Sequence, residues 1–253
     1  MKMNRSKGEV TMENKKIKWW KKILIIILIL LLIFIINIFK KTIILNNIDN
    51  KVSNLENSSN NIYAEINSED YKLKKYIKND VEKLVVERTN ENGEFSKIIQ
   101  CTYPDQRKVY TEKEGIKVMN IYNEVASVRS AHVENSDVTS SYTSIINFAY
   151  HSNIFEKIVD SIITNIKSIE IDGKKCYELT SKYNSNFIYS ENTKKMKAYV
   201  EQDSGLPIKL IEIINKNGEN IEKVITYKYQ FNIVTDEDIM EPNSQEYKIQ
   251  EQN

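Results

Sequence analysis

Residues 23–39 read ILIIILILLLIFIINIF, seventeen residues of which all but Asn37 are apolar. No glycine, proline or charged residue interrupts the run. As a helix it would be about 26 Å long at about 1.5 Å per residue, close to the ~30 Å hydrocarbon core of a bilayer. Because backbone amide groups in lipid must be satisfied within the segment, the run predicts a transmembrane helix.

Two other structures share parts of this pattern. A buried core helix normally has a polar face, and this run has none. A cleavable signal peptide needs small residues at its cleavage site, and the following residues 40–52, KKTIILNNIDNKV, offer no A-x-A-like pattern. We therefore predict an uncleaved, single-pass signal-anchor in the cell membrane over residues 23–39.

The charges on either side of the run predict its orientation. Eight Lys and Arg residues lie within residues 1–22, whereas only Lys40 and Lys41 follow the run directly. Since basic flanks stay in the cytoplasm, residues 1–22 are expected to be a basic cytoplasmic tail and the chain after residue 41 to be extracytoplasmic.

Residues 40–60 are predicted to be a juxtamembrane stalk and linker. Four of its apolar residues repeat with the 3-4-3 spacing of an a/d seam: Leu45, Ile48, Val52 and Leu55. The seam covers two heptads, fewer than the three or four that indicate a coiled coil. It is compatible with a weak homodimer through residues 45–55, and also with an anchor helix that continues for a few turns.

The charge balance bears on the partners of the extracytoplasmic part. The chain carries a formal net charge of +1; residues 1–22 contribute +6 and Lys40 and Lys41 another +2, which leaves −7 for the rest. Nucleic-acid binding needs clustered Lys and Arg. We therefore expect no nucleic-acid partner.

From Ile62 onward the apolar residues alternate with a period of two, which is typical of β-strands. Strands are predicted at 62–67, 71–78, 81–90, 94–103, 107–112 and 116–122, and again near 168–171, 175–183, 187–190, 195–202, 207–215 and 221–231. Five of the six glycines stand between such strands, at hairpin-like positions. The pattern predicts an antiparallel meander.

Residues 142–163 interrupt the meander with helical spacing. Their apolar stripe comprises Ile145, Phe148, Ala149, Phe155, Ile158, Val159, Ile162 and Ile163. Such a helix must bury its stripe on the sheet, and a sheet curved around it is the economical arrangement. The predicted fold class is therefore mainly β (α+β), an antiparallel half-barrel over residues 61–250 plugged by an amphipathic helical segment, which can enclose an apolar cavity.

Catalytic and metal-binding patterns are weak. His132 and His151 have no Cys, Asp or Glu at metal-ligand spacing, and no G-x-S-x-G, P-loop or H-E-x-x-H motif occurs. Four acidic residues could suggest calcium, namely Asp236, Glu237, Asp238 and Glu241, but Thr235 and Asp238 have the spacing of a capping box. We predict no enzyme activity, no catalytic residues, no metal and no cofactor.

The two cysteines, Cys101 and Cys176, could form a disulfide outside the cytoplasm. The strand pattern places Cys101 on an apolar face, and Cys176 on the face opposite Tyr177 and Leu179. This arrangement disfavours a disulfide between them.

The C-terminal half carries two longer motifs. Residues 197–208 read KAYVEQDSGLPI, and residues 227–239 read YKYQFNIVTDEDI, followed by Glu241-Pro242 and Tyr247. The D-S-G-L-P turn between two strands (residues 203–207) and the final D-x-D-x-x-x-P segment resemble the LolA-like superfamily of lipoprotein carriers and anti-sigma-factor regulators, in particular its membrane-anchored bacterial members. The resemblance covers residues 196–242 by motif and about residues 60–250 by layout.

The resemblance implies an eleven-stranded half-barrel with helices on its concave side. In the carriers that side binds acyl chains of lipoproteins or lipids, and in the regulators it docks a protein partner. An anchored protein cannot shuttle between membranes, so we predict an extracytoplasmic protein that holds a lipid or lipoprotein acyl chain. The alternative is a tethered sensor or interaction protein with a filled core, which docks a protein partner and has no small-molecule ligand.

Six residues are expected to line the ligand cavity between the sheet and the predicted helix: Phe148, Phe155, Val159, Ile225, Tyr227 and Tyr229. Each could also be an ordinary core residue. The tyrosines of the strands are likewise either cavity residues or good strand formers with half-buried rings.

Overall fold

The computed structural model describes residues 7–90, 92–122, 154–181, 193–216 and 218–251. The first half of the described chain contains α1 (Lys7–Ser58), β1 (Asn61–Asn67), β2 (Tyr71–Lys78), β3 (Val81–Thr89), β4 (Phe95–Thr102), β5 (Arg107–Lys113) and β6 (Ile116–Tyr122). The second half contains α2 (Ile154–Ile163), β7 (Thr164–Ile171), β8 (Lys174–Ser181), β9 (Thr193–Glu201), β10 (Pro207–Lys216), β11 (Glu219–Phe231), a 3-10 turn (Ser244–Glu246) and β12 (Lys248–Glu251).

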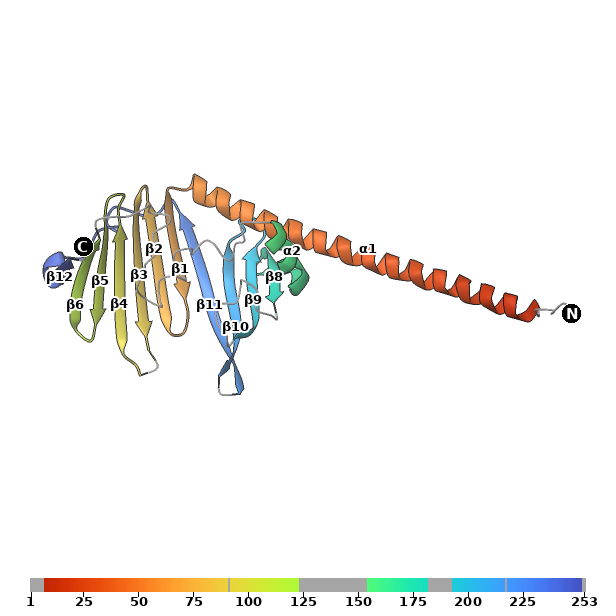
Figure 1. Cartoon of the computed structure of the whole chain (residues 1–253). Coiled ribbons are helices and arrows are strands. Elements are labelled where there is room, and N and C mark those ends of the chain that lie inside the picture. The colour runs from red at the N-terminus through yellow and green to blue at the C-terminus, as the bar shows by residue number, and fades with distance from the viewer. Residues whose placement is uncertain (1–6, 91, 123–153, 182–192, 217, 252–253) are drawn as a thin grey trace.

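All the described strands form one sheet, in the order β12-β6-β5-β4-β3-β2-β1-β11-β10-β9-β8-β7. Strands β1–β11 pair antiparallel, β11 joins the two halves by pairing with β1, and the short β12 runs parallel to β6. The sheet is an open half-barrel (Figure 1). The predicted mainly β half-barrel of about eleven antiparallel strands is thus confirmed, while the strand predicted at 187–190 and residues 142–153 of the helical segment lie outside the described residues.

The long helix α1 has an exposed apolar part. Every side chain from Leu24 to Phe34 is more than half exposed. Among the described residues, α1 is the one helix long and apolar enough to cross a membrane, over Trp19–Leu55. Figure 1 shows this part extending away from the sheet, so the described part of the chain gives it no surface to pack against there.

The C-terminal part of α1 packs on the sheet. Leu45 and Ile48 belong to the main core cluster, together with Ala64 of β1, and Val52 packs with Leu206 in a second cluster. The a/d seam therefore faces the sheet of its own chain, and the helix that contains the apolar run continues unbroken to Ser58. The seam is apolar at 3-4-3 spacing because one side of this stretch forms part of the domain core.

The predicted helical segment is described from Ile154 onward as α2. It contacts α1 and the adjacent strand β7, and Figure 1 shows it beside α1 at the β7–β8 end of the sheet. The helix that lies on the sheet itself is α1. We call the face that carries α1 the inner face; it is formed by Ile62, Ala64 and Ile66 of β1 and by the residues in register with them, and the opposite face is the outer face.

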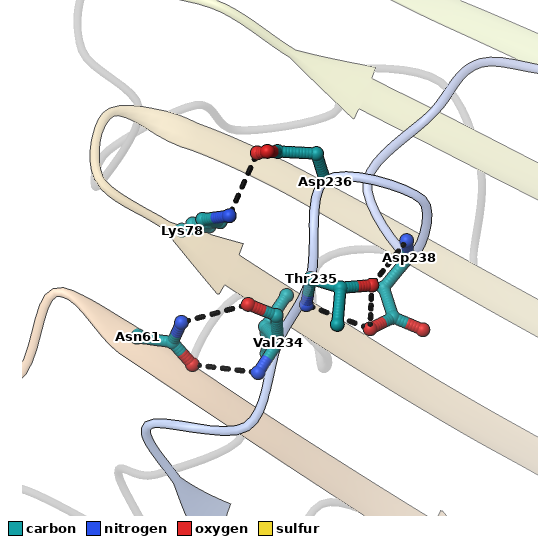
Figure 2. Close-up of polar contacts among 6 residues, drawn as sticks. All are labelled: Asn61, Lys78, Val234, Thr235, Asp236 and Asp238. Carbon is teal, nitrogen blue, oxygen red and sulfur yellow. Dashed lines mark hydrogen bonds and ion pairs between the residues drawn. The ribbon is translucent and has the colours of Figure 1, made fainter.

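The outer face carries a C-terminal segment, residues 232–247, which we call the outer strap. The side chain of Asn61 on β1 forms two hydrogen bonds of 2.8 Å with the backbone of Val234. Lys78 of β2 forms an ion pair of 2.7 Å with Asp236 (Figure 2). Thr235 and Asp238 exchange backbone and side-chain bonds as a capping box does. The predicted capping box is confirmed, but a single turn at 236–239 follows it in place of a helix.

Further along, the outer strap closes over β5. Glu241 accepts hydrogen bonds from Lys108 Nζ at 2.8 Å and from Tyr110 Oη at 2.6 Å. Burial alone would raise the pKa of Glu241, but these donors outweigh it and lower that pKa. Because the carboxylate stays ionised, it holds the strap to β5 over a wide pH range.

Both cysteines are free and fully buried. Cys101 lies on the outer face of β4 in a cluster with Tyr110 and Met119, and burial raises the pKa of its thiol to about 12. Cys176 lies on β8, and six strands separate β4 from β8 in the sheet. At about 4.8 Å per strand the two thiols are roughly 30 Å apart, so a disulfide between them is excluded.

The D-S-G-L-P turn between β9 and β10, residues 203–207, packs against α1. Gly205 has a φ of +77°, and a Cβ there would stand 2.9 Å from the backbone oxygen of Ile48. Lys51 of α1 donates a hydrogen bond to the backbone oxygen of Gln202 in the same turn. The glycine therefore serves both a left-handed backbone and the close approach of a helix.

Gly205→Ala is expected to lower the free energy of unfolding by about 2 to 3 kcal/mol, because the methyl group adds a clash with α1 to the cost of a left-handed backbone. Gly115→Ala is the matched control, since Gly115 has a φ of +78° and nothing within 4 Å of the added Cβ. Urea denaturation of both variants measures the difference. Equal losses in the two variants would show that α1 does not rest on this turn.

Candidate functional site

The inner face contains an apolar row that crosses five neighbouring strands. Its members, in register from β11 to β4, are Tyr227, Ile66, Leu73, Val86 and Ile98. Leu73 is fully buried and Val86 is 2% exposed. We call these five residues the inner apolar row; their side chains form a continuous apolar row that crosses the strands within the main core.

Beside this row the same face carries an unusual number of polar side chains. Six of them, on β2 to β6, form what we call the inner polar group: Lys75, Glu82, Gln100, Thr102, Arg107 and Asn120. Four members are at least nine-tenths buried. Buried polar groups are costly unless they are paired, so a cluster on the inner face needs a structural or a functional reason.

Some members of the inner polar group satisfy one another. Lys75 Nζ and Glu82 Oε2 form an ion pair of 2.9 Å. Gln100 Nε2 donates to Thr102 Oγ1 at 3.2 Å. These bonds tie β2 to β3 and organise β4, and they hold the charged and amide groups in fixed positions on the inner face.

The other two members lie on β5 and β6. The guanidinium of Arg107 stacks over the ring of Tyr122, 4.5 Å from its centroid. The side-chain oxygen of Asn120 is buried and accepts no hydrogen bond from the described residues. An acceptor in this condition is where a donor from a ligand would be most favourable.

A second charged region of the sheet lies at the end of the strands that is opposite to the inner polar group. Lys223 pairs with Asp70 at 3.0 Å. Burial raises the pKa of Glu212, with a contribution from the charge of Asp70 and an opposing one from Lys223. Glu212 lies in register with Lys223 on the inner face.

A comparison with protein-family models finds no match, and a comparison with curated protein sequences finds none either. Solved structures do match. An uncharacterized conserved protein from Thermus thermophilus is 10% identical, with a TM-score of 0.41, over 82% of this chain and 98% of the other. LprF from Mycobacterium bovis is 9% identical, with a TM-score of 0.38, over 78% and 94% of the two chains.

A LolA superfamily protein from Nitrosomonas europaea is 12% identical, with a TM-score of 0.20, over 72% of this chain and 88% of the other. Every one of these TM-scores lies below 0.5, so the likenesses do not indicate a function for this chain.

The structure brings together three of the six residues predicted to line a cavity. Ile225, Tyr227 and Tyr229 follow one another on the inner face of β11, with Ile225 buried and the two tyrosine rings stacked 6.5 Å apart. Val159 lies on α2 and is 56% exposed, away from β11.

Of the remaining two predicted residues, Phe155 lies in α2, and Phe148 lies outside the described residues. The contact of any of the six with a ligand remains a prediction.

The tyrosines of the strands divide between the two faces. Tyr63, Tyr76 and Tyr110 lie on the outer face, near or beneath the outer strap, whereas Tyr227 and Tyr229 lie on the inner face. The hydroxyl of Tyr63 donates to Glu65 at 2.5 Å. Most of the outer-face rings thus have a structural role.

Sequence reasoning missed the inner polar group. Its signal was present in residues 94–103, where Gln100 and Thr102 share a face with the one apolar exception, Ile98. A polar strand face is normally taken as the solvent side. Recognising Gln100 and Thr102 as inner residues needed the knowledge that the other face is covered by the outer strap.

Proposed function

We propose that this protein is a single-pass membrane protein with an extracytoplasmic half-barrel that binds an amphiphile, such as a lipid or a lipoprotein acyl chain. The acyl chain lies along the inner apolar row, and the polar end meets the inner polar group. The observation that carries the proposal is that both surfaces lie side by side on one face, as an amphiphilic ligand requires.

The anchor part of the proposal is supported by α1. Its apolar side chains from Leu24 to Phe34 have no protein partner among the described residues, which is stable only in a lipid environment or a protein assembly. The excess of Lys and Arg before this stretch favours a cytoplasmic N-terminus and an extracytoplasmic sheet. The binding face is then held close to one membrane surface, from which lipid can be supplied.

The polar part of the ligand would meet groups that are already in place. Asn120 offers a buried acceptor, Arg107 a cation, and the Lys75–Glu82 pair a fixed dipole. Preorganised groups of this kind cost little ordering entropy when a ligand binds. A zwitterionic or hydroxylated head group fits this mixture better than a simple anion, because Glu82 offsets one of the two positive charges.

A second function is favoured by the position of α1. Leu45 and Ile48 fill the inner face in front of β1 and its neighbours, so part of the half-barrel already has an apolar occupant. If α1 occupies the whole apolar surface, the protein is a tethered interaction protein with a filled core that docks a protein partner. The two functions differ in whether lipid reaches the inner apolar row.

Photocrosslinking in a membrane distinguishes them. The full chain is reconstituted into nanodiscs that contain a phosphatidylcholine with a diazirine on its acyl chain, irradiated, and digested for mass spectrometry. Crosslinks on β2, β3 and β4 at the inner apolar row, in addition to those on α1, are expected for lipid binding. The outer-face residue Ile99, on the same strand as Ile98, is the internal control and should remain unlabelled.

Crosslinks confined to the exposed part of α1 would overturn lipid binding and leave the filled core as the function. Asn120→Leu provides a matched variant, since it removes the buried acceptor while keeping the size of the side chain close. Lipid binding through the inner polar group predicts weaker labelling of the inner apolar row in this variant, with unchanged labelling of α1. Equal labelling of the inner apolar row in the variant and in the unaltered chain would show that the inner polar group is not part of the binding site.

A further inference from the structure

The helix α2 is joined to α1 immediately beyond the apolar stretch. Ser161 of α2 is fully buried, and its hydroxyl lies 3.0 Å from that of Thr42. Lys41 Nζ donates to the backbone oxygen of Thr164, the residue that follows α2, at 2.8 Å. Two polar contacts of adjacent α1 residues thus fix the position of α2 along the anchor helix.

This position corresponds to a defined depth in a bilayer. Thr42 lies three residues after Phe39, where the apolar run ends, which is about 4.5 Å along a helix. The polar interface on each side of the hydrocarbon core is roughly 5–8 Å thick. A helix attached at Thr42 therefore lies within the interface, close to the hydrocarbon boundary.

The exposed side chains that the structure describes on α2 are apolar. Val159 and Ile162, three residues apart and so on one side of the helix, are 56% and 51% exposed, while the polar Ser161 is buried against α1. This is the reverse of the usual arrangement for a surface helix in water, because the apolar side chains are exposed and the hydroxyl group is buried. At a lipid interface it is the expected arrangement, because the apolar side meets the acyl boundary.

The neighbouring charges and the layout agree with this environment. Lys40 is exposed at the same level of α1, where its ammonium group can meet anionic lipid head groups. Figure 1 shows α2 lying across α1, at the end of the sheet from which the anchor extends. A helix that contacts the anchor at this level lies at the membrane surface.

We propose that α2 is an interfacial helix, with Val159 and Ile162 inserted into the outer surface of the bilayer. This holds the β7–β8 end of the half-barrel against the membrane, so that the domain has a fixed orientation and is not a freely tumbling tethered body. This inference rests on the anchor proposed above. The partner that contacts the exposed side chains of α2 is lipid.

The test is site-specific quenching in vesicles. Single cysteines replace Val159 or Ile162 in a full chain that carries Cys101→Ala and Cys176→Ala, and each is labelled with the fluorophore NBD. The protein is reconstituted into phosphatidylcholine–phosphatidylglycerol vesicles with and without a phosphatidylcholine that bears a doxyl quencher near its head group. Two control sites are Leu32→Cys in the anchor and Ile116→Cys, which is 65% exposed on β6.

Labels at 159 and 162 are expected to be quenched several-fold more strongly than the label at 116. The label at 32 is also expected to lie in lipid. If the label at 32 is in lipid but those at 159 and 162 are no more quenched than that at 116, the inference is overturned and the anchor stands. In that case a blue-shifted emission at 159 would mean that another part of the protein covers α2. A label at 32 outside lipid would overturn the anchor itself, and with it the interfacial helix.

Discussion

A chain that begins at Ser59 is expected to lose about 6 kcal/mol of unfolding free energy relative to a chain that begins at Lys40. The deleted residues include Leu45, Ile48 and Val52, which are 7%, 4% and 1% exposed. Burial of each such side chain contributes about 2 kcal/mol. Since domains are stable by only about 5–15 kcal/mol, the shorter chain should be at or beyond the limit of folding.

Urea denaturation followed by far-UV circular dichroism measures this loss in the two soluble chains. Within the longer chain, Ile48→Ala should lower the unfolding free energy by about 2–5 kcal/mol, because it leaves a cavity in the main core. Asn47→Ala changes the neighbouring exposed residue and should cost well under 1 kcal/mol. If the chain from Ser59 were as stable as the longer one, α1 would be a tether only and not a part of the core.

Lys75→Met is expected to lower the unfolding free energy by about 3–5 kcal/mol, because it leaves the carboxylate of Glu82 buried without its charge partner. The side chains of Lys75 and Glu82 are 10% and 11% exposed, so neither is well solvated. Urea denaturation of the full chain in detergent gives the value. Lys97→Met is the matched control, since its pair with Glu87 has side chains that are 33% exposed and should contribute less than about 1 kcal/mol.

The double variant Lys75→Met with Glu82→Leu separates structure from function. Replacing both members of a buried pair by apolar groups is often neutral or stabilising, so stability should return toward that of the unaltered chain. If the inner polar group exists to bind a polar head, the double variant should be stable yet defective in lipid labelling of the inner apolar row. A double variant that remains as unstable as Lys75→Met would contradict the ion-pair explanation.

The strand pattern of the sequence predicted the sheet well but could not assign its faces. In residues 94–103 the alternation of Ile99 and Cys101 with Gln100 and Thr102 was visible. Alternation by itself does not say which side is inside, and here both sides are covered, one by α1 and its neighbours and the other by the outer strap. Periodicity therefore located the strands, whereas the candidate site depended on tertiary contacts.

The seam at residues 45–55 shows a similar limit. Its 3-4-3 spacing predicted a helix with one apolar side, which α1 has. The identity of the surface that covers this side depends on Gly205 and Leu206, about 150 residues later in the chain. Of the predicted cavity residues, Ile225, Tyr227 and Tyr229 came together because one strand carries all three, while Val159 belongs to a different element.

The pairing of β1 with β11 has a consequence for the order in which the protein is made. Ile62 lies beside Phe231, and the seam of α1 packs against residues of β9 to β11, which are synthesised last. At about 5–20 residues per second, the ribosome takes on the order of 10–30 s to produce the intervening residues. During this interval β1–β6 can already form successive local hairpins, but the apolar side of α1 lacks its partners from β9 to β11. The newly made chain therefore passes through a stage in which part of the apolar side of α1 is uncovered, and the core closes only when nearly the whole chain has emerged.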